Sequence, residues 1–159
     1  PRPILTSNRG RSSGSRGYQR DLLVNAMRSL EKDNLLLGDV LSRKEYLREM
    51  SKTKAVVSPF GFGEICYRDF EAVISGSVLI KPDISHIETF PDFFVAGETY
   101  IPCRWDFSDL GNTLNAIDAR NKKKNISIPM NAQNKYRELY LKSRHFQKHL
   151  RKIVQKALS

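Results

Sequence analysis

The sequence predicts an α/β fold: a Rossmann-like parallel sheet with helices on both faces, followed by a long C-terminal helix. Two observations support this prediction. Short apolar segments alternate with amphipathic, helix-like segments through residues 4–82, and the connections between them are short. The 159 residues are also 40% hydrophobic and 28% charged, which is typical of one ordinary domain with a buried core.

The first strand, helix and second strand are expected within residues 4–38. Ile4–Thr6 is short and apolar and predicts a strand, and a loop rich in Gly, Ser and Arg follows over residues 7–17. The next segment has the apolar spacing of a helix, with one face formed by Leu22, Leu23, Ala26 and Leu30. Leu35–Leu37 predicts a buried strand that ends at Gly38.

The second helix opens with a capping signal. Ser42 has Glu45 three residues further on, which is the pattern of a capping box. Three side chains of this helix are expected to face inward: Tyr46, Leu47 and Met50. Ala55–Val57 then predicts a third strand, which the following Ser-Pro pair stops.

A glycine-rich turn at residues 60–63 leads into a third helix, expected from about Glu64 to Ser75. Gly76 ends this helix, and Val78–Ile80 predicts a fourth strand. The side chains of the helix that are expected to face the core are Phe70, Val73 and Ile74.

This alternating order implies parallel strands joined by right-handed crossovers. In such sheets, ligands bind at the carboxyl ends of the strands. The two glycine-rich loops, 7–17 and 60–63, are both expected at that edge.

The second half of the chain is less regular. Tyr100–Ile101 predicts a short strand, and Ser108 is expected to cap a helix that runs through residues 110–117. Pro129 is expected to start a long last helix. This helix carries an apolar stripe at alternating spacings of three and four residues, expected to be buried: Tyr136, Leu139, Ser143, Phe146, Leu150 and Ile153.

Charge is concentrated at the two ends of the chain, and the net charge is +10. Residues 1–20 hold five Arg and no acid, residues 21–120 hold 11 basic and 16 acidic residues, and residues 121–159 hold 11 basic residues and one acid. Cationic ends favour anionic partners: phosphate groups, a membrane surface or nucleic acid. An ordinary solvated basic face is the alternative for the C-terminal segment.

Composition also excludes several classes of protein. No apolar run approaches the roughly 20 residues that cross a bilayer, and two cysteines are too few for a disulfide scaffold or a cysteine zinc site. No group of carboxylates has metal-ligand spacing, so we expect no metal. A reducing, cytoplasmic setting is expected. Because the chain opens at Pro1 rather than Met, we expect it to be a piece of a longer protein.

The glycine turn and the helix after it form a candidate phosphate site. Gly61 and Gly63 let backbone approach a ligand closely, and a helix N-terminus stabilises anions. Arg68 can hold a phosphate through its guanidinium fork, and Glu71 can accept hydrogen bonds from ribose hydroxyls. On the expected helix one polar stripe holds Glu64, Arg68, Glu71 and Ser75. An intrahelical salt-bridge ladder explains the same stripe, and both interpretations stay open.

The first loop adds cations close to the end of the first strand. They are Arg9, Arg11, Arg16 and Arg20. A disordered basic tail is the alternative, but the loop lies inside a strand–helix unit.

Several short blocks follow one another along roughly residues 4–118. They are Gly10-Arg11 with Arg16-Gly17, the segment from Gly38 to Leu47, Ala55 to Pro59, Gly61-Phe62-Gly63 with Phe70-Glu71-Ala72, Gly76 with Val78-Leu79-Ile80, and Gly97 to Pro102. In this order they resemble the C-terminal, donor-binding half of GT-B glycosyltransferases, in particular glycosyltransferase group 1. That family usually has Glu directly before Gly-Phe-Gly, where this chain has Phe60. Three extra residues also separate Gly-Phe-Gly from Glu71, and Arg68-x-x-Glu71-Ala72 in this wider spacing is similar to exostosin-type glycosyltransferases.

The resemblance implies roles for individual residues. Arg68 and Glu64 are the catalytic candidates, with Glu64 in place of the missing acid. The diphosphate is expected near the arginines, the ribose at Glu71, and the base near residues 38–41. The donor-binding candidates are Arg11, Arg16, Val40, Leu41, Gly61, Phe62, Gly63, Arg68 and Glu71.

The resemblance also implies a function: transfer of a sugar from a nucleoside diphosphate to an acceptor, without a metal or other cofactor. Residues 1–120 are expected to form the nucleotide-sugar-binding domain, and residues 121–159 a basic linker and a C-terminal helix that packs on it. The N-terminal acceptor domain is expected to be missing here, so the chain alone should be inactive. We expect a cytoplasmic enzyme, compatible with peripheral membrane contact through the last helix. The alternative is a non-enzymatic basic module that binds nucleic acid or an anionic membrane, although no nucleic-acid-binding motif is present.

Overall fold

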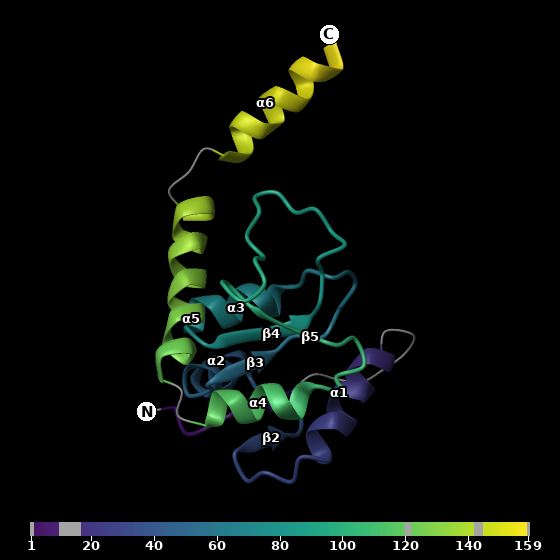
Figure 1. Cartoon of the computed structure of the whole chain (residues 1–159), viewed down its shortest axis with the longest axis vertical. Coiled ribbons are helices and arrows are strands. Elements are labelled where there is room, and N and C mark those ends of the chain that lie inside the picture. The colour runs from purple at the N-terminus through teal and green to yellow at the C-terminus, as the bar shows by residue number, and fades with distance from the viewer. Residues whose placement is uncertain (1, 10–16, 120–121, 142–144, 159) are drawn as a thin grey trace.

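A computed structural model of the chain describes residues 2–9, 17–119, 122–141 and 145–158. Along these residues the elements are β1 (Thr6–Asn8), α1 (Tyr18–Arg28), β2 (Leu35–Leu37), α2 (Arg43–Ser51), β3 (Ala55–Val57), α3 (Tyr67–Ser75), β4 (Val78–Pro82), β5 (Ile101–Cys103), α4 (Leu110–Asp118), α5 (Lys122–Tyr136), a π-helical turn η2 (Arg137–Leu141) and α6 (His145–Leu158). Figure 1 shows β3, β4 and β5 at the centre with helices around them, β2 at the lower edge, and α6 extending away from the rest of the chain.

The strand pairs within the described residues are parallel. β1 pairs with β2, and β3, β4 and β5 pair in that order. The two groups of strands meet where Ile4 bridges Thr53 and where the Ala55 N–H donates to the Leu5 carbonyl at 2.9 Å. The strands therefore lie in the order β2-β1-β3-β4-β5. This arrangement confirms the predicted parallel sheet.

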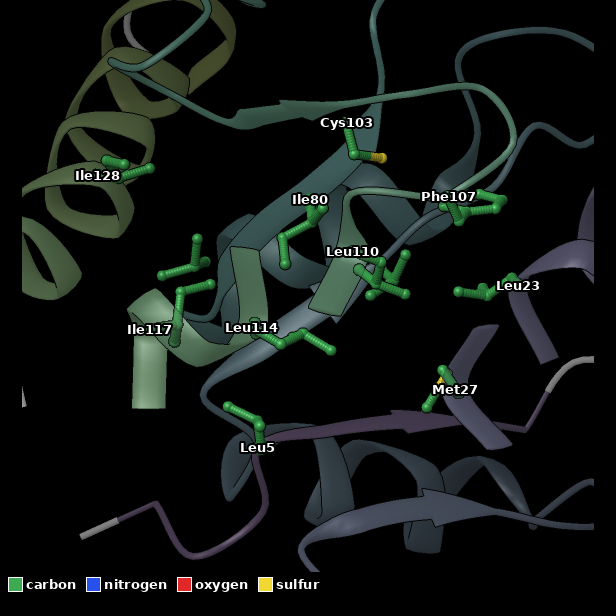
Figure 2. Close-up of a cluster of buried hydrophobic side chains, with 13 residues drawn as sticks. Leu5, Leu23, Met27, Ile80, Cys103, Phe107, Leu110, Leu114, Ile117 and Ile128 are labelled. Carbon is green, nitrogen blue, oxygen red and sulfur yellow. The ribbon is translucent and has the colours of Figure 1, made fainter. Parts of the chain in front are cut away.

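Side chains alternate between the two faces of the sheet, as the pleat of a strand requires. On one face, β3 contributes Ala55 and Val57 and β4 contributes Val78 and Ile80 to a cluster covered by α1 and α4. Figure 2 shows this cluster, which the helices complete with Leu23, Met27, Leu110, Leu114 and Ile117.

The opposite face is covered by α2 and α3. Val56 and Leu79 point to this face and pack with Met50 of α2 and Ala72 of α3. Helices therefore lie on both faces of the sheet, as predicted, and apolar strands are buried between them.

The capping box of α2 is present as predicted. The Glu45 N–H donates to the Ser42 hydroxyl at 3.4 Å, and the Ser42 N–H donates to the Glu45 carboxylate at 3.1 Å. Met50 is buried and Tyr46 half-buried, but Leu47 is 43% exposed, so its predicted inward position is wrong. Tyr46 and Met50 are four residues apart and share one face, whereas Leu47 lies about 100° around the helix from Tyr46.

Several element boundaries differ from the prediction, among them those of β1 and α4. β1 begins at Thr6 rather than Ile4, because its pairing with β2 begins there while Ile4 bonds to the segment before β3. The N-cap of α4 is Asp109 rather than Ser108. The N–H and hydroxyl of Ser108 both donate to the Asp106 carboxylate, which holds Ser108 in the turn before the helix.

Aromatic side chains join α5 to the body of the fold. The rings that contact one another, with centroids 5.0 to 6.4 Å apart where they pair, are Phe70 of α3, Phe93 and Phe94 of the β4–β5 connection, Tyr136 at the end of α5 and Tyr140 of η2. This cluster fixes α5 beside α3 and β4.

The C-terminal segment differs from the single long helix predicted to start at Pro129. Pro129 lies inside α5 instead of starting a helix, and the burial of Ile128 and Ala132 on either side offsets the backbone hydrogen bond that proline removes.

The predicted apolar stripe is buried only in part. Tyr136 and Leu139 pack against the body, while Leu150 and Ile153 on α6 are about half exposed. Ser143 and the side chain of Phe146 lie outside what the structure describes. One contact between α6 and the β4–β5 connection is His149 stacked on Phe90, with centroids 3.7 Å apart.

Candidate functional site

A cavity of about 500 Å³ opens at the carboxyl edge of the sheet. Its walls come from the end of β1, the segment after β2, α2, β3 and the turn that leads into α3. The lining residues are Ser7, Asn8, Arg9, Arg20, Val40, Leu41, Arg43, Tyr46, Met50, Val56, Gly61, Phe62, Cys66, Tyr67, Arg68 and Glu71.

The position of the cavity follows from the topology. After β1 the chain crosses over through α1 on one face of the sheet, and after β3 it crosses over through α3 on the other. The connections that follow β1 and β3 therefore turn to opposite faces of the sheet and leave a crevice between them. This is the switch point at which open α/β sheets bind ligands.

Most of the predicted site residues meet in this cavity. Val40, Leu41, Gly61, Phe62, Arg68 and Glu71 all line it. Gly63 and Glu64 are not among its lining residues, and Arg11 and Arg16 lie outside the described residues.

The predicted polar stripe that begins at Glu64 is wrong, because α3 starts three residues later. Cys66 is the N-cap of α3, and its N–H donates to the carboxylate of Asp69 at 3.1 Å. Glu64 therefore lies in the turn before the helix. Ile74, expected in the core, is 62% exposed, while Val73 is buried.

The cavity is strongly cationic. Among the residues that the structure describes, its walls include Arg9, Arg20, Arg43 and Arg68, against the single carboxylate of Glu71. Arg68 is the second residue of α3, so its positive charge lies beside the positive end of the helix dipole. Repulsion between the two is relieved when an anion binds between them, and free N–H groups of the first helical turn can donate to the same anion.

Arg9 of the cavity wall is paired with Glu49. Its guanidinium makes two hydrogen bonds to the Glu49 carboxylate, at 2.9 and 2.6 Å. These bonds hold the pKa of Glu49 below its usual value and raise the pKa of Arg9. Gly38 packs against this pair, since a Cβ atom there would lie 2.6 Å from Arg9 Nη1.

Glu71 is oriented from the neighbouring helix α2. Its two carboxylate oxygens accept hydrogen bonds from Arg43 Nη1 at 2.9 Å and from the Tyr46 hydroxyl at 3.3 Å. Burial raises the pKa of Tyr46, and the nearby charge of Arg68 acts in the opposite direction. A carboxylate has about four lone-pair positions, so Glu71 keeps acceptor capacity for a ligand.

Arg43 and Tyr46 were not predicted as site residues. They lie three residues apart on α2 and therefore on one face of that helix. The capping box sets where α2 begins and therefore which of its residues share a face. Only the packing of α2 against α3 shows that the face with Arg43 and Tyr46 meets Glu71. The same contact means that Glu71 pairs between helices rather than within α3.

The described residues contain no group of three or more His, Cys, Asp or Glu side chains arranged to hold a metal ion. In the same part of the chain, no helix combines the length and the apolar character needed to cross a membrane.

Comparisons with solved structures place the fold. HepE of Anabaena, solved with UDP and glucose, superimposes with a TM-score of 0.61 at 14% identity over 99% of this chain and 49% of HepE. HepE with UDP-glucose gives 0.55 at 15% identity, over 86% and 36% of the two chains. The C-terminal domain of LpcC, a glycosyltransferase group 1 family protein of Francisella tularensis, gives 0.51 at 15% identity, over 77% and 62%.

No family model matches the sequence, and no curated protein sequence matches it either. The chain spans about half the length of the HepE chain with which it superimposes over 99% of its residues. Together with the parallel sheet and the helices on both faces, the superpositions show that this chain has the Rossmann-like fold of the C-terminal half of GT-B glycosyltransferases.

Proposed function

We propose that this chain is the donor-binding half of a glycosyltransferase that transfers a sugar from a nucleoside diphosphate to an acceptor. The observation that carries the proposal is the arginine-lined cavity at the switch point of the sheet, with the N-terminus of α3 at its wall. Support comes from HepE, which has this fold and was solved with UDP and with UDP-glucose.

Each wall of the cavity suits one part of such a donor. The diphosphate would lie against Arg68 and the first turn of α3, and Arg11 and Arg16 are proposed to reach it from the first loop. The ribose hydroxyls would donate to Glu71. The base would lie near Val40 and Leu41, which follow β2 and line the cavity.

The proposed chemistry is electrostatic. As the bond between the sugar and the diphosphate breaks, negative charge develops on the departing phosphate oxygens. Arg68 and the N–H groups of α3 stabilise that charge. The Glu64 carboxylate is outside the cavity lining, so we assign the stabilising role to Arg68. The acceptor is proposed to bind between this chain and a second domain, because this chain matches only about half of HepE.

Calorimetric titration of UDP, GDP and ADP into the full-length protein tests the proposal. We expect saturable binding with a preference for one base, because a formed cavity contacts the nucleoside as well as its phosphates. Arg48→Ala is a matched control, since Arg48 is an exposed arginine of α2 that does not line the cavity. It should leave binding unchanged.

The same titrations at low and high salt separate the competing function. Nucleic-acid binding through the cationic ends would fall steeply with salt and show no preference for a nucleoside diphosphate. If none of the three nucleotides bound, or if all bound equally and only at low salt, the proposed function would be wrong.

A further inference from the structure

β4 carries a charged residue where the strand is otherwise apolar. Lys81 follows Val78, Leu79 and Ile80, and its side chain is completely buried. Its ammonium group lies 2.6 Å from the carboxylate of Asp69, which is also completely buried. A buried ion pair is weak evidence of added stability, because desolvation of both charges offsets their attraction and apolar residues of similar volume often do as well. Added stability therefore does not by itself explain why Lys81 and Asp69 are buried together.

The polar contacts of Lys81 are with the segment that contributes to the wall of the cavity. Besides Asp69, Lys81 Nζ donates to the backbone carbonyl of Glu64 at 2.6 Å, and it lies 4.7 Å from the ring centroid of Phe94. Asp69 in turn accepts from the N–H of Cys66. The pair thus holds two backbone groups of the segment that joins the glycine turn to α3.

This segment, residues 61–68, has little buried side chain that could fix it. Phe62 and Tyr67 are each 89% exposed, so neither side chain anchors the segment in the core. The glycines at 61 and 63 add backbone freedom. A segment with little buried side chain opens easily unless polar bonds hold it.

We infer that Lys81 is a positioning residue, which fixes the backbone of residues 61–68 through the Glu64 carbonyl and so places Arg68 and the N-terminus of α3 for the diphosphate of the donor. Asp69 is its counter-ion and completes the cap of α3. This inference rests on the proposed function for the identity of the ligand. The fixing of the segment itself does not depend on that function.

The test uses a double variant of the full-length protein, Lys81→Met with Asp69→Asn. It removes both charges together, so no unpaired charge is left buried, and the amide oxygen introduced at position 69 can still accept from the Cys66 N–H. Amide hydrogen exchange of residues 61–68 should become about tenfold faster, and the Kd for UDP should rise about tenfold, as expected for the loss of one charge-assisted hydrogen bond.

The matched control is Lys54→Met with Asp118→Asn. This ion pair, at 2.7 Å, joins the residue before β3 to the end of α4, so it lies at the opposite edge of the sheet. It should change neither the exchange of residues 61–68 nor the Kd for UDP. If the first double variant did not fold, Lys81→Gln with Asp69→Asn would take its place, because it also leaves no unpaired charge buried and the shorter glutamine side chain cannot reach both partners.

The measurements test the inference about Lys81 and the proposed function separately. Unchanged exchange of residues 61–68 in a folded variant would overturn the inference, and so would a Kd for UDP within twofold of wild type. If the wild-type protein itself did not bind a nucleoside diphosphate, the proposed function would fall. Hydrogen exchange would then still decide whether Lys81 fixes the segment.

Discussion

Replacing Arg68 with alanine separates a phosphate-binding role from a structural one. Arg68 is the second residue of α3, and it belongs to none of the three buried hydrophobic clusters. A cation in the first turn of a helix opposes the helix dipole, at a cost of about 0.3–1 kcal/mol. The variant should therefore melt at or slightly above the temperature of the wild-type protein.

Binding should respond very differently from stability. Loss of one bidentate, charge-assisted contact to a phosphate should cost about 2–3 kcal/mol, which raises the Kd of the preferred nucleoside diphosphate about 30- to 150-fold. The corresponding monophosphate lacks the outer phosphate, so its Kd should change much less. Glu71→Ala should weaken both nucleotides to the same extent, because the ribose is common to them.

Calorimetry with both nucleotides, together with a thermal melt, measures these effects. Arg48→Ala serves again as the control for general loss of positive charge from the surface. If Arg68→Ala kept a Kd for the diphosphate within threefold of wild type, or weakened both nucleotides equally, the placement of the diphosphate at the N-terminus of α3 would be wrong.

Three further predictions concern neighbouring residues. The bonds to Arg9 lower the pKa of Glu49, so the Glu49 carboxylate should stabilise the fold at pH values above its usual pKa of 4.5. This stability should be lost as the pH falls through the pKa of Glu49 in the folded protein. Urea unfolding at several pH values measures the effect, and Glu49→Gln should flatten the pH dependence of the unfolding free energy. Gly38→Ala should push Arg9 from its place and weaken nucleotide binding, with a loss of about 1 kcal/mol in unfolding free energy, because the Cβ atom meets the end of a flexible side chain. Burial raises the pKa of Cys103 to about 12, so a thiol reagent at pH 8 should label the half-buried Cys66 and leave Cys103 unmodified until the protein unfolds.

The α/β class and most of the elements that build the sheet are predictable from the sequence alone. The bounds predicted for Leu35–Leu37 and Ala55–Val57 match β2 and β3, and the capping box that opens α2 is present. These features are predictable because they depend on neighbouring residues: apolar runs bounded by turn residues, helical spacing, and a side chain that caps the helix it precedes. The alternation of strands and helices also placed the glycine turn at the carboxyl edge.

Predictions were wrong where one local signal competed with packing or with a second local signal. Pro129 is a strong helix-start signal, yet it lies within α5 because residues on both sides of it are buried against the fold. Glu64 was expected on α3 because its spacing fits a helix, but the cap formed by Cys66 and Asp69 starts the helix after it. For Pro129, packing against another part of the chain decided the outcome, whereas for Glu64 a local cap did.

Only the tertiary structure decided which side chains meet at the cavity. Glu71 is held by Arg43, 28 residues earlier in the sequence, and Lys81 reaches Asp69 from the neighbouring strand. No periodicity connects such residues, because their meeting depends on how α2 and α3 pack on the sheet and on the order of the strands beneath them. Local pattern determines the elements, whereas the geometry of a site depends on contacts between elements that are far apart in the chain.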